Sequence, residues 1–126
     1  MILSRNELEQ LCNNHLVELL FNRRGVPNPK PTRRMLCTRD QRLLKSELGK
    51  LTFNYNPPTS RLPYDPVQKG LVVVFDILKQ DWRMIPANGV SFVNAVPTWP
   101  QENFWEYFDK KLRNMTKRQK INFINQ

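Results

Sequence analysis

Residues 69–90 constrain the fold more than any other segment of the chain. Within them, residues 71–75 form an uninterrupted run of aliphatic and aromatic side chains, Leu-Val-Val-Val-Phe, which is typical of a β-strand. Polar residues 79–81 follow as a turn, and a second apolar segment, residues 82–85, closes at Pro86. The pattern predicts a β-hairpin with a nearly continuous apolar first strand. Such a hairpin favours a small β-barrel, an architecture used more often for binding than for catalysis.

Four further strands are predicted from alternating apolar and polar residues. Residues 15–24 and 32–38 are predicted to form a long hairpin. The segment between them contains three prolines and is predicted to be a loop, because proline cannot donate a hydrogen bond to a strand ladder. Residues 50–55 and 90–96 alternate in the same way. The first hairpin is expected to place Met35 and Cys37 on one face. The last strand is expected to place four side chains on one face: Val90, Phe92, Asn94 and Val96.

Two short helices are predicted in the first half of the chain. Ser4 and Glu7 match the S-x-x-E capping box and start a helix that ends near residues 13–14. Residues 40–48 are predicted to form a second helix, which Gly49 would end. Residues 56–68 contain four prolines and are predicted to be a loop.

Two more helices are predicted near the C-terminus. Thr98 and Gln101 have the spacing of a capping box, with a proline in the first turn, and Thr116 and Gln119 repeat that spacing. The first of these helices carries an apolar stripe that is expected to pack on the barrel: Phe104, Trp105, Phe108 and Leu112. The predicted fold class is therefore mainly β with helices (α+β), with a barrel over residues 1–97 and a helical extension over residues 98–126.

The charge of the chain points to anionic partners. The 126 residues, enough for one modest core, include 20 Lys and Arg against 11 Asp and Glu, giving a net charge of +9. Nucleic acid, an acidic protein face or an anionic membrane surface would each suit this charge. No segment approaches 18 apolar residues, and the acids near the N-terminus argue against a secretion signal.

The cysteines and the histidine give little sign of metal chemistry or catalysis. Cys12 and Cys37 lack CxxC spacing, and His15 is the single histidine, so no metal site is predicted. Free thiols in a reducing cytoplasm are the preferred interpretation, with one disulfide left open. Asp76 and Asp81 flank the hairpin turn, where turn chemistry explains them. No catalytic motif is present, so no catalytic residue and no cofactor are predicted.

Two clusters of basic residues are the candidate binding sites, and together they hold eleven of the twenty basic side chains. At the tip of the first hairpin lie Arg23, Arg24, Lys30, Arg33 and Arg34. Along the C-terminal tail lie Lys110, Lys111, Arg113, Lys117, Arg118 and Lys120. Each cluster could grip a phosphate backbone, in which case binding would weaken with salt. The alternative for each cluster is a solvated surface.

Trp82 and Arg83 admit two interpretations. Trp82 could stack on a base and Arg83 could contact a phosphate. The alternative, which we favour for Trp82, is a structural role in the core, with the stem of Arg83 covering the ring. Arg83 is retained among the candidate binding residues.

Two motifs resemble a family of small SH3-like β-barrel proteins of tailed bacteriophages. An R-x-M-x-C-T strand matches at Arg34, Met35, Cys37 and Thr38. A V-x-D-x-x-K-x-x-W-R hairpin matches at Val74, Asp76, Lys79, Trp82 and Arg83, with Ile85 in place of an aromatic residue. The likeness covers roughly residues 15–94. The long insert at 40–68, Met84 in place of serine, and the helical tail depart from the pattern. The resemblance implies an SH3-like barrel and a phage origin, and it implies no activity.

The predicted function is a non-enzymatic phage accessory protein in the cytoplasm of the host bacterium. It would bind DNA or RNA, or a host nucleoprotein machine, through a basic face with little dependence on sequence. The alternative is an inhibitor or adaptor that binds an acidic host protein such as RNA polymerase, a nuclease or a defence protein, using residues 56–66. A virion component is a third possibility.

Overall fold

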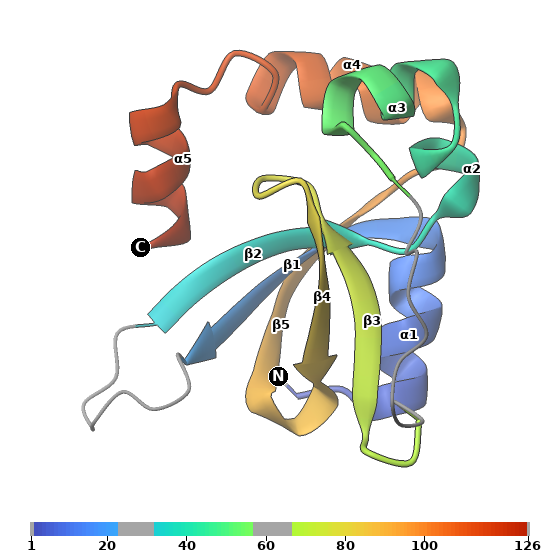
Figure 1. The fold of residues 1–126 in the computed structure, drawn as a ribbon, viewed down its shortest axis with the longest axis vertical. Coiled ribbons are helices and arrows are strands. Elements are labelled where there is room, and N and C mark those ends of the chain that lie inside the picture. The colour runs from blue at the N-terminus through green and yellow to red at the C-terminus, as the bar shows by residue number, and fades with distance from the viewer. Residues whose placement is uncertain (1, 23–31, 57–66, 126) are drawn as a thin grey trace.

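A computed structural model describes residues 2–22, 32–56 and 67–125, which form an α+β fold (Figure 1). The elements in chain order are α1 (Arg5–Asn14), β1 (His15–Asn22), β2 (Thr32–Thr38), α2 (Gln41–Leu44), α3 (Glu47–Phe53), β3 (Leu71–Asp76), β4 (Asp81–Pro86), a 3-10 helix η1 (Ala87–Gly89), β5 (Val90–Pro97), α4 (Gln101–Lys111) and α5 (Lys117–Ile124). None of the helices in these ranges is both long and apolar enough to cross a membrane.

The five strands form one antiparallel sheet in the order β4-β3-β2-β1-β5. Both predicted hairpins are confirmed: β1 pairs with β2 up to Asn22 opposite Thr32, and β3 pairs with β4 up to Asp76 opposite Asp81. Among the described residues, no pairing joins the edge strands β4 and β5. The α+β class is therefore confirmed, while the closed barrel is not.

The sheet divides between β2 and β3, where only two residue pairs join the strands. Past this junction, backbone carbonyl groups of β3 accept hydrogen bonds from arginine side chains instead of from a neighbouring strand. Arg5 donates its Nε–H to the carbonyl of Leu71 at 3.0 Å, and Arg39 donates to the carbonyl of Val73 at 2.7 Å. These bonds satisfy backbone acceptors that a neighbouring strand would otherwise occupy, so they fix the place of β3 beside α1.

Two apolar cores lie on the two faces of the sheet. The first, called the α1 core, joins helix α1 to the strands and contains Leu8, Cys12, Val17, Leu19, Met35, Cys37, Val72, Val74, Ile85, Ala87 and Val90. The second, called the α4 core, joins helices α2, α3 and α4 to the opposite face and contains Leu16, Leu36, Leu43, Leu44, Phe53, Tyr55, Phe75, Ile77, Phe104, Trp105, Phe108 and Leu112. Figure 1 shows α1 on one side of the sheet and α2 to α4 together above it.

These two cores explain the apolar run of β3. Val72 and Val74 point into the α1 core, whereas Phe75 belongs to the α4 core. A strand that is covered on both faces gains from apolar side chains at every position, and its sequence therefore loses the usual alternation. Met35 and Cys37 both lie in the α1 core, which confirms that they share a face.

The predicted strand at residues 50–55 is wrong, because residues 47–53 form helix α3. Ser46 starts the helix by accepting a hydrogen bond from the backbone N–H of Gly49 at 3.0 Å. Gly49 therefore lies inside the helix and does not end a preceding one. A Cβ atom at this position would lie 2.0 Å from the carbonyl oxygen of Leu43, so only glycine allows the two helices to approach. Asn54, with φ of 51°, ends α3.

Two further predictions are corrected at the end of the sheet. Glu18 of β1 pairs with Asn94 and Leu19 pairs with Phe92, so Val93 of β5 is left as a bulge. After the bulge, the side chains of β5 alternate in the opposite sense, so later residues lie on the other face of the sheet from the predicted one. Ala95 packs with Phe92 against the α1 core, so Asn94 and Val96 do not share the face of Phe92.

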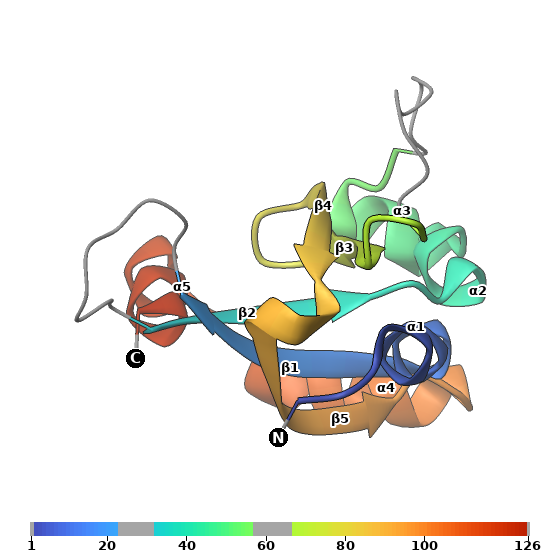
Figure 2. The ribbon, with the colours of Figure 1, turned by 90° about the horizontal axis from the view of Figure 1, so that it is seen from below.

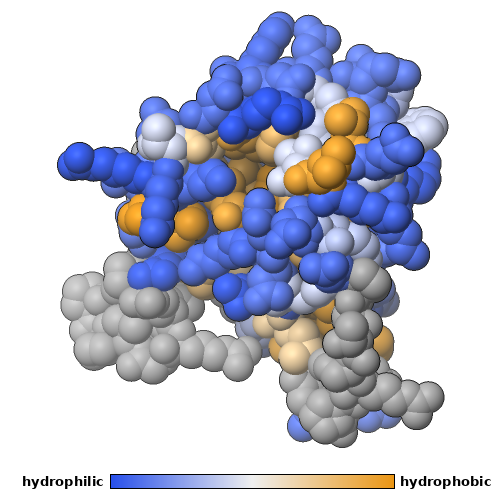
Figure 3. Space-filling view, turned by 45° about the horizontal axis from the view of Figure 1, so that its top comes forward, coloured by the Kyte–Doolittle hydropathy of each residue, from blue (hydrophilic) through white to orange (hydrophobic). Residues whose placement is uncertain are grey.

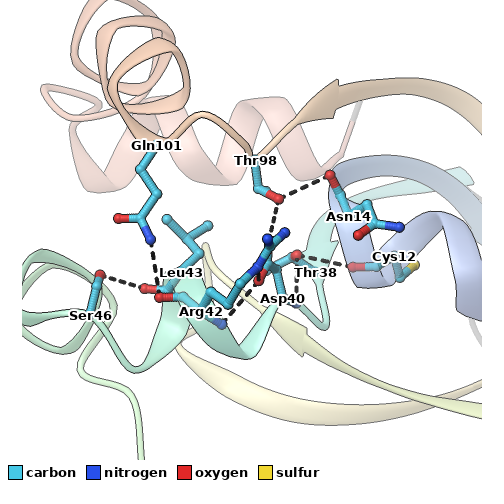
Figure 4. A network of polar contacts seen from close by, with 9 residues as sticks. All are labelled: Cys12, Asn14, Thr38, Asp40, Arg42, Leu43, Ser46, Thr98 and Gln101. Carbon is cyan, nitrogen blue, oxygen red and sulfur yellow. Dashed lines mark hydrogen bonds and ion pairs between the residues drawn. The ribbon is translucent and has the colours of Figure 1, made fainter.

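Thr98 does not cap α4, which has Pro100 at its N-cap and no side-chain cap there. The hydroxyl of Thr98 contacts the carbonyl of Asn14 at 2.9 Å and the carboxylate of Asp40 (Figure 4). Asp40 also accepts a hydrogen bond from the backbone N–H of Arg42 at 3.0 Å and so starts α2. The polar junction therefore ties together the ends of α1 and β5 and the start of α2.

Candidate functional site

A cleft of about 570 Å³ lies between helix α5 and the turn that joins β3 to β4. Figures 1 and 2 both show α5 beside the far ends of β1 and β2, and in Figure 1 the β3–β4 turn points toward it. The described residues that line the cleft are Arg33, Leu78, Lys79, Asp81, Arg83, Lys117, Lys120, Ile121, Ile124 and Asn125. Five of these side chains are basic and one is acidic, so the cleft carries a net positive charge.

The basic side chains come from four separate elements. Arg33 extends from β2 and Arg83 from β4, Lys79 lies on the turn, and Lys117 and Lys120 belong to α5. In the described ranges, none of the five forms an ion pair. Like charges held this close repel one another, so an anion bound between them relieves that repulsion as well as making contacts.

Asp76 holds the turn that carries Lys79. Its Oδ1 accepts hydrogen bonds from the backbone N–H groups of Leu78 and Lys79, each at 3.1 Å. Burial raises the pKa of Asp76, while these two bonds and the nearby Arg83 and Lys79 act in the opposite direction. The turn chemistry predicted for Asp76 is thus confirmed.

Helix α5 is held to the sheet by a small set of contacts. Thr116 and Gln119 form the predicted capping box, with both reciprocal hydrogen bonds present. The guanidinium of Arg34 lies 5.4 Å from the ring centre of Phe123, and the same guanidinium pairs with Glu18 of β1. Arg34 is therefore a support for the helix, and its charge is already compensated.

Three of the side chains that line the cleft are apolar, and we call these three its floor. Leu78 comes from the turn, and Ile121 and Ile124 come from α5, which has no buried residue. Ile121 keeps 48% of its surface exposed. Figure 3 shows the helical side of the molecule as largely hydrophilic, with separate apolar patches between long polar side chains. The cleft is therefore amphipathic, because these apolar side chains share its lining with five basic side chains, which we call the rim.

A smaller cavity of about 200 Å³ continues the cleft toward α4, since Leu78 and Lys120 line both. Arg113 lines this second cavity, pairs with Asp109, and lies over the ring of Phe108 at 5.5 Å from its centre. We call the cleft and this cavity together the α5 trough.

The structure separates the predicted basic residues into groups. Arg33, Arg83, Lys117 and Lys120 meet in the cleft, and Arg113 joins them in the trough. Lys110 and Lys111 line a different depression, together with Gln119 and Phe123, and Lys110 pairs with Glu106. Arg118 is exposed on α5 and lines none of these cavities. Arg23, Arg24 and Lys30 lie outside the described residues.

Lys79 and the apolar floor were missed as site residues. From the sequence, Lys79 is placed in the hairpin turn and in the family motif but not among the binding residues, and the hydrogen bond from its backbone N–H to Asp76 fixes its position in that turn. Ile121 and Ile124 share one face of α5 at i, i+3 spacing, and that signal was available in the sequence.

Trp82 takes the structural role predicted for it. Its ring packs against the α4 core beside Tyr55 and Phe75, and its Nε1–H donates to the carbonyl of Asn56 at 2.9 Å. Arg83, one residue later, lines the cleft instead. The apolar stripe of α4 is likewise buried in the α4 core, as expected.

The two thiols lie together in the α1 core. Cys12 and Cys37 are both fully buried and unbridged, and the hydrogen bond that the Cys37 thiol donates to Cys12, together with burial, raises the pKa of Cys37 well above its usual range. Over the ranges that the structure describes, no three His, Cys, Asp or Glu side chains gather as a metal site would require.

No protein-family model, no curated protein and no solved structure matches this chain.

Proposed function

We propose that this chain is a non-enzymatic nucleic-acid-binding protein that holds phosphate groups in the α5 trough. The observation that carries the proposal is the convergence of five basic side chains, free of ion pairs within the described residues, on one cleft. Phosphate groups of a nucleic acid repeat at a spacing that lets several cations act together, and each contact releases counterions. Because lysine and arginine contacts to phosphates carry no base information, binding is largely independent of sequence.

The proposal includes an SH3-like architecture and a phage accessory role in the host cytoplasm. The return of β5 to pair with β1, and the 3-10 helix η1 directly before β5, support an SH3-like arrangement of the strands. The R-x-M-x-C-T and V-x-D-x-x-K-x-x-W-R motifs support the phage relationship. Neither feature specifies a partner, so the binding function depends on the trough alone.

The test compares salt dependence between two variants of equal charge. Arg83→Gln with Lys120→Gln removes two cations from the cleft, whereas Lys45→Gln with Lys50→Gln removes two exposed cations outside it. Affinity for a labelled oligonucleotide is measured by fluorescence anisotropy over a range of salt concentrations. The slope of log K against log salt should fall by about 0.7 per lost contact for a single strand and about 0.9 for duplex.

The control variant should keep the wild-type slope. Equal effects of the two double variants would mean that net charge alone drives binding, and would contradict a site in the trough. Failure of the wild-type protein to bind DNA and RNA at low salt would overturn the proposed function.

An adaptor for a host protein is the second candidate, and α3 is the observation that favours it. Leu51 is 83% exposed and Leu48 is 50% exposed on the outer side of this helix. Exposed apolar side chains on one helix often mark a protein contact. A pull-down from nuclease-treated bacterial lysate tests this role: one host protein retained by wild type and lost by Leu48→Ser with Leu51→Ser would establish the adaptor.

A further inference from the structure

The α5 trough combines two chemistries that a duplex backbone does not need together. Its rim is basic, with Lys79, Arg83 and Lys117 among the lining residues, and its floor is formed by the apolar side chains of Leu78 and Ile121. Phosphates would pair with the basic side chains of the rim. The apolar side chains of the floor would still face charged groups or water. The ligand that matches both parts carries an apolar surface within a few ångströms of its phosphates.

Single-stranded nucleic acid has this property. Its bases are unstacked or easily unstacked, and each base has an apolar face that can lie against a side chain. In a duplex, those faces are buried in the stack, and a protein meets phosphates, sugars and base edges. The volume of the cleft, about 570 Å³, falls in the range of pockets that bind small organic groups.

Arg113 supplies a second surface for a base. Its guanidinium lies 5.5 Å from the ring centre of Phe108 and 6.0 Å from that of Trp105, it pairs with Asp109, and 43% of the side chain is exposed. Guanidinium planes are one of the surfaces on which proteins stack single-stranded bases. Since Leu78 and Lys120 line both cavities, the cavity that Arg113 lines adjoins the cleft.

We propose that the α5 trough selects single-stranded over double-stranded nucleic acid, with bases on Leu78, Ile121 and Arg113 and phosphates on the rim cations. This inference rests on the proposed function and adds the strandedness of the ligand. The apolar floor contributes affinity that salt does not screen. Some single-strand binding should therefore persist at salt concentrations that abolish duplex binding.

The test uses the full chain, an oligo-dT 12-mer, a 12-base-pair duplex and heparin as a polyanion without bases. Wild type should bind the single strand about tenfold more tightly than the duplex at the same salt concentration. Ile121→Ser should weaken single-strand binding severalfold and leave duplex and heparin binding unchanged. Ile2→Ser, at an exposed isoleucine outside the trough, is the matched control.

Arg113→Lys is the second variant, because it keeps the charge and removes the plane. It should weaken single-strand binding without changing the salt slope, whereas Lys111→Arg should have no effect. Thermal unfolding followed by circular dichroism verifies that each variant folds.

The outcomes separate the two proposals. Binding of neither oligonucleotide at low salt overturns the proposed function. Equal or tighter binding of the duplex, or of heparin, with no effect of Ile121→Ser and Arg113→Lys, overturns the single-strand inference and leaves the phosphate site in place.

Discussion

Helices α1 and α5 begin with the same device and end in different circumstances. Each has a complete capping box, Ser4 with Glu7 in α1 and Thr116 with Gln119 in α5. Helix α1 then buries Leu8 and Cys12 in a core, whereas α5 buries no residue. A capping box therefore starts a helix but does not decide how the helix packs against the sheet. Helix α1 completes the α1 core, whereas α5 packs Phe123 against the α4 core and leaves Ile121 48% exposed.

The largest expected difference between the helices is in packing. Leu8→Ala should lower the free energy of unfolding by about 2–5 kcal/mol, because it opens a cavity in the α1 core. Ile121→Ala, at a half-exposed site on α5, should lower it by less than about 0.5 kcal/mol. Urea denaturation of both variants measures the two values. Similar losses would mean that α5 is as firmly docked as α1.

The buried thiol of Cys37 gives the α1 core a dependence on pH. Its pKa is raised in the folded protein, so the stability that the neutral thiol contributes is complete below the unfolded pKa, about 8.5, and is lost as the pH rises toward the folded value. Over that window the free energy of unfolding should fall by up to about 1.4 kcal/mol per pH unit for this group.

Cys37→Ala provides the control for that slope. Unfolding in urea at pH 8.5 and 9.5 should show a smaller decline for the variant than for wild type. A parallel decline would assign the pH dependence to other groups, and rapid labelling of the native thiols by a disulfide reagent would contradict their burial.

Removal of each capping residue should affect the two helices differently. Ser4→Ala should lower global stability by about 1 kcal/mol, because α1 unfolds only with its core. Thr116→Ala removes an equivalent bond, but its effect should be confined to α5, which can open locally. Hydrogen exchange separates the two: faster exchange limited to residues 117–124 is expected for Thr116→Ala. Global destabilisation by that variant would contradict local opening.

The smallest expected effect concerns the turn that faces α5. Burial raises the pKa of Asp76, so its ionised form is penalised in the folded protein at pH 7. Asp76→Asn keeps an oxygen acceptor for Leu78 and Lys79, and it should raise stability by up to about 0.5 kcal/mol at pH 7. The gain should shrink as the pH is lowered from 7 to 4, because the folded carboxyl of Asp76 gains its proton as the pH falls through its raised pKa. Asp76→Ala, lacking the acceptor, should be less stable than wild type at both pH values.

Local signals in the sequence predicted the parts of the fold that local chemistry controls. The caps at Ser4 and Thr116 and both hairpins follow from neighbouring residues, and all are present. The error at α3 has a tertiary cause. Alternating residues 50–55 resemble a strand, but Gly49 lets the helix pack against the carbonyl of Leu43, and no neighbour in sequence reveals that contact.

The candidate site was predicted only as a set of charges. Sequence reasoning grouped Arg33 with Arg34, yet only Arg33 lines the cleft, whereas Arg34 pairs with Glu18 and lies over the ring of Phe123. Arg33 and Arg83 line one cleft with residues of α5 because α5 packs beside the sheet. That arrangement depends on contacts between distant segments, which spacing along the chain does not encode.

The pairing of β1 with β5 determines when a growing chain can finish its sheet. His15 lies opposite Pro97, so β1 has an open edge until the ribosome has released the whole of β5. Open strand edges recruit other strands, and a nascent chain in this state is prone to aggregate. Chaperones that shield such edges would therefore matter most during the synthesis of residues 23–97. Residues of α5 and of the sheet line the α5 trough together, so the trough can form only once α5 has been made as well.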